Sequence, residues 1–244
     1  KYKIATLSRG YKRQSEGFIL AQANSNARLL GDEPFQFFEK FPSIQVAVDA
    51  DRKNGIEQLL SLPEKPEVIL LDDAFQHRKV KAGFYILLTS YGDLYSDDCM
   101  LPTGNLRETR SGAKRADLIV VTKCPFDLSL DKQNDIRKRL KLSVNQQLYF
   151  TFIAYDTFVY GEKQKVNINE IQSTVKVLVA GIAKPEPFFT YLKNTNDVCL
   201  SFPDHHNFTE KDILEITKTA QNNIIITTEK DYMRLKGSLP SEQL

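Results

Sequence analysis

VILLDD, residues 68–73, is a short apolar run that ends in two adjacent carboxylates. A continuous apolar run of this length is typical of a strand that is covered on both faces of a parallel sheet. The carboxyl edge of such a sheet is where α/β proteins bind ligands, and Gln76 and His77 add hydrogen-bonding groups there. Asp72 and Asp73 are therefore candidates for binding Mg²⁺, which prefers carboxylate oxygens. The alternative is that they only cap the turn after the strand.

Apolar segments of the same kind recur along the chain, with helical or loop segments between them. One helix is marked clearly by Thr209 as N-cap and Asp212 three residues later. Alternation of strands and helices predicts a doubly wound α/β architecture. The expected strands are 3–8, 44–49, 68–72, 84–89, 118–122, 176–180, 198–202 and 223–228, and the expected helices are 35–41, 55–61, 131–142 and 210–221.

The composition changes between residues 147 and 166. The segments 148–155 and 157–160 are aromatic and β-prone, and no helical segment separates them. Two such neighbours predict an antiparallel β-ribbon. We expect this ribbon, 147–166, to connect a larger domain, 1–146, to a smaller α/β domain, 167–244.

Bulk composition excludes several classes of protein. The chain has 244 residues, 41% of them hydrophobic and 26% charged, as in an ordinary soluble globular protein. A formal net charge of +2 gives no global field for binding nucleic acid. No apolar run approaches the roughly 20 residues that a membrane span needs. The three cysteines have no paired spacing, which argues against a disulfide framework or a zinc site and fits a reducing compartment.

Basic side chains gather in two glycine-containing loops. Arg9, Lys12 and Arg13 follow the first expected strand, and Arg107 lies in LPTGNLRE, residues 101–108. Guanidinium groups pair bidentately with phosphate, so these loops suit a phosphorylated ligand. The alternative is plain basic surface.

Two acidic or histidine-rich segments could act on protons. Asp32 and Glu33 lie in GDEP, residues 31–34, either as activating carboxylates or as the cap of the following helix. His205 and His206 follow Asp204 directly before the helix that starts after Thr209, where an imidazole could act as a general acid or base. Metal binding by His205 and His206 is disfavoured, because the chain has only three histidines and no third ligand is clustered with these two.

Taken together, seven short motifs resemble the tetraacyldisaccharide 4'-kinase family and occur in that family's order. The resemblance implies a P-loop-kinase-like parallel sheet domain that is incomplete, plus a smaller α/β domain joined by a β-ribbon. The motifs are TLSRGY (6–11), GDEP (31–34), LDDAFQH (71–77), LPTGNLRE (101–108), GIAKPEPF (181–188), FPDHH (202–206) and TEKD (228–231).

The resemblance also implies an activity, its cofactors and its partners. Members transfer phosphate from ATP, with Mg²⁺, to the 4' hydroxyl of a tetraacyldisaccharide 1-phosphate precursor of lipid A. They work at the cytoplasmic face of the bacterial inner membrane. By resemblance, Asp32 accepts the hydroxyl proton or orients the hydroxyl, and His205 supports it. By the same resemblance, Asp72 and Asp73 serve the metal and nucleotide with Gln76 and His77 beside them, and the substrate contacts are Arg9, Lys12, Arg13, Glu33 and Arg107.

The chain departs from the family pattern in a few places. Ala74 and Asn105 replace the more common Gly and Pro, and His206 leaves the choice of histidine open; we select His205, because it directly follows Asp204. No Gly-x-x-x-x-Gly-Lys-Ser/Thr motif occurs in the sequence. The family's phosphate loop and hydrophobic membrane helix precede the strand that begins this chain.

The missing phosphate loop leads to two expectations. This polypeptide alone should have negligible kinase activity, because the loop supplies phosphate binding. Without the membrane helix, it should also be soluble. The sheet should also lack a central strand, and so expose apolar edges that favour association or poor solubility. Two alternatives stay open: another P-loop-type nucleotide-dependent enzyme, or a non-catalytic module that binds nucleotide or phosphate.

Overall fold

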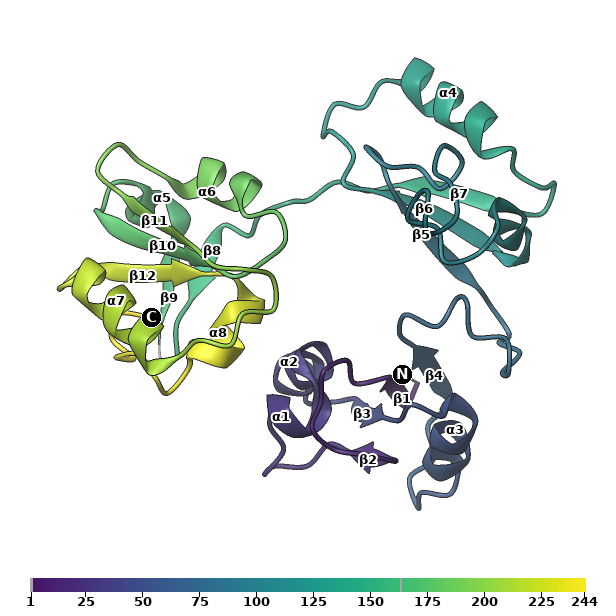
Figure 1. Ribbon diagram of the computed structural model, residues 1–244, viewed down its shortest axis with the longest axis horizontal. Helices are drawn as coiled ribbons and strands as arrows, with labels where there is room; N and C mark the ends of the chain where they lie inside the picture. The colour runs from purple at the N-terminus through teal and green to yellow at the C-terminus, as the bar shows by residue number, and fades with distance from the viewer. Residues whose placement is uncertain (1, 163) are drawn as a thin grey trace. The chain divides into compact units, whose positions relative to one another are not determined.

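A computed structural model describes residues 2–162 and 164–244, which form two compact units (Figure 1). The first unit consists of Lys1–Leu70 together with Asp156–Leu244, and the second is Leu71–Tyr155. The first unit joins distant parts of the chain because helix α2 (Asp32–Lys40) packs on helix α8 (Glu229–Leu235). The domain division 1–146, 147–166 and 167–244 stays a prediction.

A four-stranded sheet forms the amino-terminal part of the first unit, in the order β2-β3-β1-β4. Strand β1 (Ile4–Ser8) runs parallel to β3 (Gln45–Val48), and β2 (Ile19–Leu20) pairs antiparallel with β3. Strand β4 (Val68–Leu71) lies at the edge. The core residues of β1 and β3 are buried, as expected for apolar strands under α1 (Ala27–Leu30), α2 and α3 (Arg52–Leu60).

The carboxyl-terminal part of the first unit is a three-stranded parallel sheet in the order β11-β10-β12. Its central strand, β10 (Lys176–Ala180), is buried at every residue. Val177 and Val179 face a cluster with Ile216 of α7 (Glu210–Ala220), whereas Leu178 joins the opposite cluster with Leu192 of α6 (Glu186–Leu192). Helices therefore cover both faces. The outer strands are β11 (Val198–Ser201) and β12 (Ile224–Thr227), and α5 (Ile168–Gln172) precedes β10.

The second unit is another parallel sheet, in the order β5-β6-β7. Its strands are β5 (Ile86–Ser90), β6 (Leu118–Thr122) and β7 (Gln147–Phe150), with a 3₁₀ helix at Arg110–Arg115. Helix α4 (Leu130–Leu140) connects β6 to β7 and buries Ile136 and Leu140 in the core of the unit. Such a crossover helix is what two parallel neighbours require.

The prediction that the aromatic segments 148–155 and 157–160 pair with each other in an antiparallel ribbon is wrong. Strand β7 belongs to the parallel sheet, because Leu148 and Phe150 pack against the core of the second unit. An antiparallel pair does exist, but it joins β8 (Phe158–Tyr160) to β9 (Lys165–Asn167). The α/β fold class with parallel sheets is confirmed.

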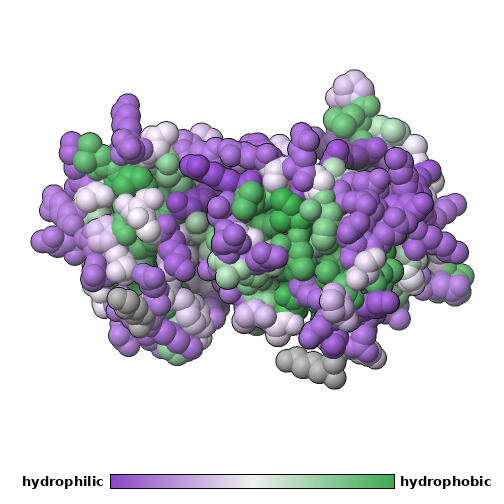
Figure 2. All heavy atoms as spheres, turned by 90° about the horizontal axis from the view of Figure 1, so that it is seen from below, coloured by the Kyte–Doolittle hydropathy of each residue, from purple (hydrophilic) through white to green (hydrophobic). Residues whose placement is uncertain are grey.

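Apolar side chains reach the surface in both units, and Figure 2 shows apolar patches on one face of the molecule. Leu70 on β4 is 53% exposed, and Leu88 on β5 is 63% exposed; both strands lie at sheet edges. Edge strands with exposed apolar residues favour association, which stays a prediction here. Within the described residues, no helix has the length and apolar character to cross a membrane.

Candidate active site

Asp32 is held at the first turn of helix α2 by the backbone around it. Gly31, the N-cap of α2, has φ 91° and ψ 160°, a conformation that is essentially restricted to glycine. The preceding helix α1 ends at the same glycine, so the chain turns sharply there. A carboxylate in the first turn interacts favourably with the positive end of the helix dipole.

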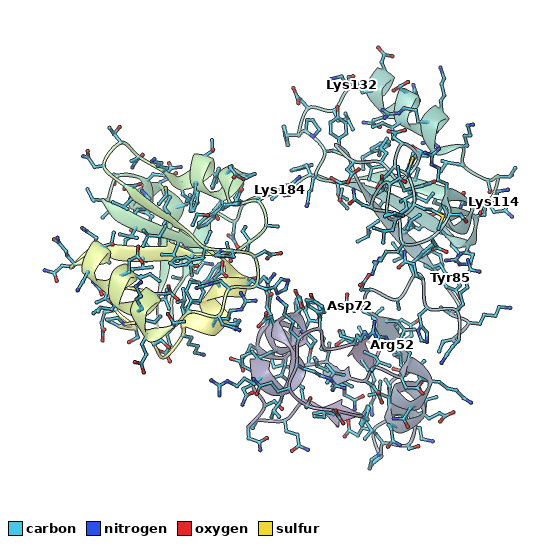
Figure 3. All side chains as sticks on the ribbon, viewed as in Figure 1. Arg52, Asp72, Tyr85, Lys114, Lys132 and Lys184 are labelled. Atoms are coloured by element: carbon cyan, nitrogen blue, oxygen red, sulfur yellow. The ribbon has the colours of Figure 1, made fainter. Side chains whose placement is uncertain are left out.

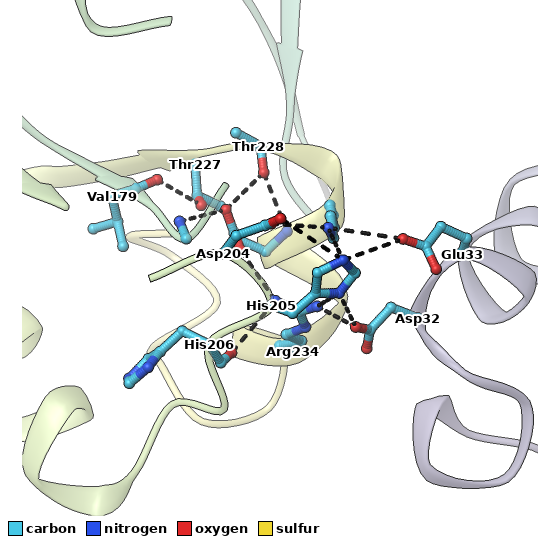
Figure 4. A network of polar contacts seen from close by, with 12 residues as sticks. Asp32, Glu33, Val179, Asp204, His205, His206, Thr227, Thr228 and Arg234 are labelled. Carbon is cyan, nitrogen blue, oxygen red and sulfur yellow. Dashed lines mark hydrogen bonds and ion pairs between the residues drawn. The ribbon is translucent and has the colours of Figure 1, made fainter. Parts of the chain in front are cut away.

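His205 approaches Asp32 from the loop between β11 and α7 (Figure 4). Its backbone has φ 58°, in the left-handed region that non-glycine residues seldom adopt. Its Nδ1 lies 3.3 Å from Asp32 Oδ2, and its ring meets Tyr11 edge to face at 5.8 Å between centroids. The two residues paired by sequence reasoning are therefore neighbours, although 173 positions separate them.

Arg234 is a member of the site that sequence reasoning missed. Its Nη2 donates to Asp32 Oδ2, and its side chain is only 7% exposed. Its Nη1 lies 3.3 Å from His206 O and 3.5 Å from Asp231 Oδ1. Asp231 is fully buried and accepts hydrogen bonds from Gly181 N at 2.9 Å and Thr228 Oγ1 at 2.8 Å. A fixed carboxylate thus anchors the arginine that binds Asp32.

These contacts determine the charge state of Asp32. Burial raises the pKa of its carboxyl, but the hydrogen bond and charge of Arg234, followed by the hydrogen bond from His205, outweigh burial and hold the pKa below its ordinary value. Asp32 is therefore a carboxylate near neutral pH. Both hydrogen bonds end on Oδ2, and among the described residues none is found on Oδ1.

Lys230 lies on the other side of the His205 ring. Its Nζ is 3.1 Å from His205 Nε2, 3.3 Å from Asp204 Oδ1 and 3.7 Å from Glu33 Oε1. Burial raises the pKa of Asp204, and the hydrogen bond and charge of Lys230 more than offset this and lower it. Lys230 and Arg234 share one face of α8 because four residues separate them. In the sequence, only the TEKD motif and the spacing of four positions point to Lys230 and Arg234.

His206 has a separate role from His205. Its Nε2 lies 2.9 Å from Asp212 Oδ2, and its ring stacks on Phe202 with 5.1 Å between centroids. Asp212 also completes the capping box of α7 with Thr209, as expected from the sequence. His206 therefore supports the helix start, and His205 is the histidine that faces Asp32.

The candidate metal and nucleotide residues lie in the second unit, directly after β4 (Figure 3). Asp73 has φ 42°, and Arg107 donates to both of its carboxylate oxygens, at 2.7 and 3.1 Å. The hydrogen bond to Asp73 raises the pKa of Arg107, and burial only partly opposes it. Arg107 thus binds a protein carboxylate here, and its expected contact with substrate stays a prediction.

Asp72 and Asp73 have the chemistry of only a partial Mg²⁺ site, and Arg107 already occupies both oxygens of Asp73. The described residues contain no group of three carboxylate, histidine or cysteine side chains that could hold a metal. Mg²⁺ commonly binds one or two carboxylates and completes its shell with phosphate oxygens and water, so Asp72 and Asp73 fit as a partial site. His77 Nε2 is buried and has no hydrogen-bond partner among the described residues, so a polar ligand would satisfy it.

The basic loop after β1 divides into a structural and an accessible part. Arg13 donates to Gly17 O at 2.6 Å and Val48 O at 3.4 Å, so its guanidinium is occupied by backbone carbonyls. Arg9 and Lys12 are exposed, and Lys12 lies over the Tyr11 ring at 5.5 Å. Arg9 and Lys12 are the members of this loop that remain accessible to a ligand.

Comparison with known proteins identifies close relatives. The family model LpxK, tetraacyldisaccharide-1-P 4'-kinase, matches residues 1–244. The tetraacyldisaccharide 4'-kinase of Flavobacterium johnsoniae is 66% identical over 244 residues, which cover 100% of this chain and 72% of that protein. The protein of the same name from Bacteroides thetaiotaomicron is 48% identical over 257 residues, covering 96% of this chain and 66% of its own length.

A solved structure is also similar. The crystal structure of an "apo" form of LpxK from Aquifex aeolicus, in complex with ATP, matches with a TM-score of 0.73 and 27% sequence identity. The match covers 97% of this chain and 71% of that one.

Proposed function

Because the chain belongs to the tetraacyldisaccharide-1-P 4'-kinase family, we propose that Asp32 activates the 4' hydroxyl of a tetraacyldisaccharide 1-phosphate for attack on ATP. The observation that carries this proposal is the fixed Asp32 carboxylate, which Arg234 and His205 hold through Oδ2. Family membership favours this kinase over another nucleotide-dependent enzyme or a non-catalytic module.

The proposed step is a single phosphoryl transfer. The sugar oxygen forms a bond to the γ-phosphorus as the bond from that phosphorus to the β,γ-bridging oxygen breaks, which leaves ADP. The hydroxyl proton passes to Asp32 Oδ1, the oxygen that His205 and Arg234 do not occupy. Such transfers depend mainly on positioning and on neutralising charge, and a carboxylate held by two donors keeps its orientation.

The donor side would use the second unit. Asp72, with Asp73, would hold Mg²⁺, which neutralises charge on the nucleotide phosphates when it is bound. Arg107 would keep Asp73 oriented, and His77 with Gln76 would offer polar contacts at the same loop. Arg9, Lys12 and Glu33 are proposed contacts for the phosphorylated sugar.

The acceptor also determines where the reaction takes place. A disaccharide with four acyl chains partitions into a bilayer, since each buried CH₂ contributes about 0.8 kcal/mol. ATP is available on the cytoplasmic side of the inner membrane, so we infer that the protein works at that face. Contact with the membrane surface is part of the same proposal.

Replacement of the proposed base tests this function. In the full-length protein, Asp32→Asn keeps the shape of the side chain but cannot accept a proton as a carboxylate does. We expect kcat to fall by about 10²- to 10⁴-fold, the usual contribution of general base catalysis. His205→Gln should be milder because the carboxylate remains. Wild-type turnover by Asp32→Asn would refute the proposal. Inactivity of the polypeptide 1–244 by itself stays a separate prediction.

A further inference from the structure

Lys230 contacts His205 but has no part in the proton transfer proposed above. Its Nζ is 3.1 Å from His205 Nε2, while on the opposite side of the ring His205 Nδ1 is 3.3 Å from Asp32 Oδ2. Helix α8 carries both Lys230 and Arg234, so one element supplies a cation to each side of the imidazole.

The contacts of His205 with Lys230 and with Asp32 require the same tautomer of the neutral imidazole. An ammonium group only donates, so Nε2 must accept from Lys230 through its lone pair. A neutral imidazole carries one N–H, which then lies on Nδ1. An ionised carboxylate only accepts, so Asp32 Oδ2 needs that N–H.

The opposite form of the ring has its own possible partners. Glu33 Oε1 and Asp204 Oδ2 lie 3.8 and 3.9 Å from Nε2 and could accept from a proton there. Arg234 Nη2, 3.3 Å from Nδ1, could then donate to Nδ1 in place of His205 donating to Asp32. The environment of His205 is therefore balanced between two tautomers.

The position of Lys230 favours one of these two tautomers. This lysine is closer to Nε2 than either carboxylate is, and it also pairs with both of them, with Asp204 at 3.3 Å and Glu33 at 3.7 Å. An N–H on Nε2 would point a donor at an ammonium. We propose that Lys230 is a positioning residue that holds His205 in the Nδ1–H tautomer, so that the ring donates to Asp32. The inference rests on the proposed function of Asp32.

The consequence for the reaction is geometric. With the proton on Nδ1, His205 and Arg234 both donate to Oδ2, and Oδ1 stays directed toward the acceptor hydroxyl. With the proton on Nε2, the Nδ1 lone pair would face Oδ2. Repulsion between the lone pair and the carboxylate oxygen would then move the carboxylate away from the ring. A group that fixes the tautomer of a catalytic histidine acts through orientation, and its loss reduces turnover more than binding.

The test is a ¹⁵N NMR measurement of the imidazole nitrogens in the full-length protein, at a pH where the ring is neutral. The sequence has three histidines, so His205→Gln assigns the signal by its disappearance. In the wild type we expect a protonated Nδ1 and an unprotonated Nε2 at His205. Lys230→Met, which removes the donor but keeps the length of the side chain, should shift the signals toward Nε2–H. Lys230→Arg, which keeps a donor, is the matched control.

Kinetics give the second readout. Lys230→Met should lower kcat by about tenfold, or about 1.4 kcal/mol, with KM for both substrates nearly unchanged. Lys230→Ala provides a smaller second variant if the methionine prevents folding. Unchanged imidazole signals in a folded Lys230→Met protein would overturn the inference, as would a change confined to KM. Activity of Asp32→Asn would instead refute the proposed function, and the NMR result would still report the tautomer.

Discussion

Replacement of Arg234 by methionine removes the main support of Asp32. The guanidinium binds Asp32 and also lies 3.5 Å from the buried carboxylate of Asp231 and 3.3 Å from the carbonyl oxygen of His206. Methionine fills a similar volume but leaves both carboxylates without their cation. Arg234→Lys keeps the charge and is the matched control.

The cost to stability follows from the burial of these groups. Breaking a buried ion pair by removing one partner typically costs 3–5 kcal/mol. Asp32 retains contact with water, at 23% side-chain exposure, and Asp231 keeps its hydrogen bonds from Gly181 N and Thr228 Oγ1. We therefore expect a loss at the lower end, about 3 kcal/mol, measured by urea unfolding followed by circular dichroism.

The pH dependence of activity should also change. Arg234 is the largest of the contributions that lower the pKa of Asp32, so without it burial raises that pKa. A general base works as the carboxylate, and the variant should therefore lose kcat/KM at a higher pH than the wild type does. Arg234→Lys should keep most of the wild-type profile. An acid limb that does not move in a folded Arg234→Met protein would refute this account of Asp32.

Two further substitutions test the fold of the first unit. Lys176→Met should lower the free energy of unfolding by about 3 kcal/mol or more. The reason is that Lys176 and Asp197 form a fully buried ion pair, with Nζ and Oδ2 2.6 Å apart. Thermal unfolding that matched the wild type would contradict this. Gly31→Ala should cost roughly 1–3 kcal/mol and reduce kcat, since φ is 91° and a Cβ would lie 3.1 Å from Tyr11 O. Gly17→Ala, at φ 65° in open space, is the control, and an equal loss of kcat there would argue against a positioning role for Gly31.

Most elements of secondary structure could be predicted from local sequence patterns. The strands at 118–122 and 176–180 have the bounds expected from their apolar runs, and the capping box at Thr209 starts α7 as expected. The pairing of β7 could not be predicted in this way. An aromatic strand suits either a ribbon or a parallel sheet, and only packing of Leu148 and Phe150 on the core determines which one forms.

The sequence by itself determined the family, the α/β class, and Asp32 and His205 as candidates, because these depend on short motifs and local periodicity. The tertiary structure determined what surrounds them. Arg234 and Lys230 join the site only because α8 packs on α2, which brings together residues 202 positions apart, and no local pattern encodes that contact. The charge of Asp32 and the tautomer proposed for His205 are therefore properties of the fold, since both depend on cations that α8 supplies.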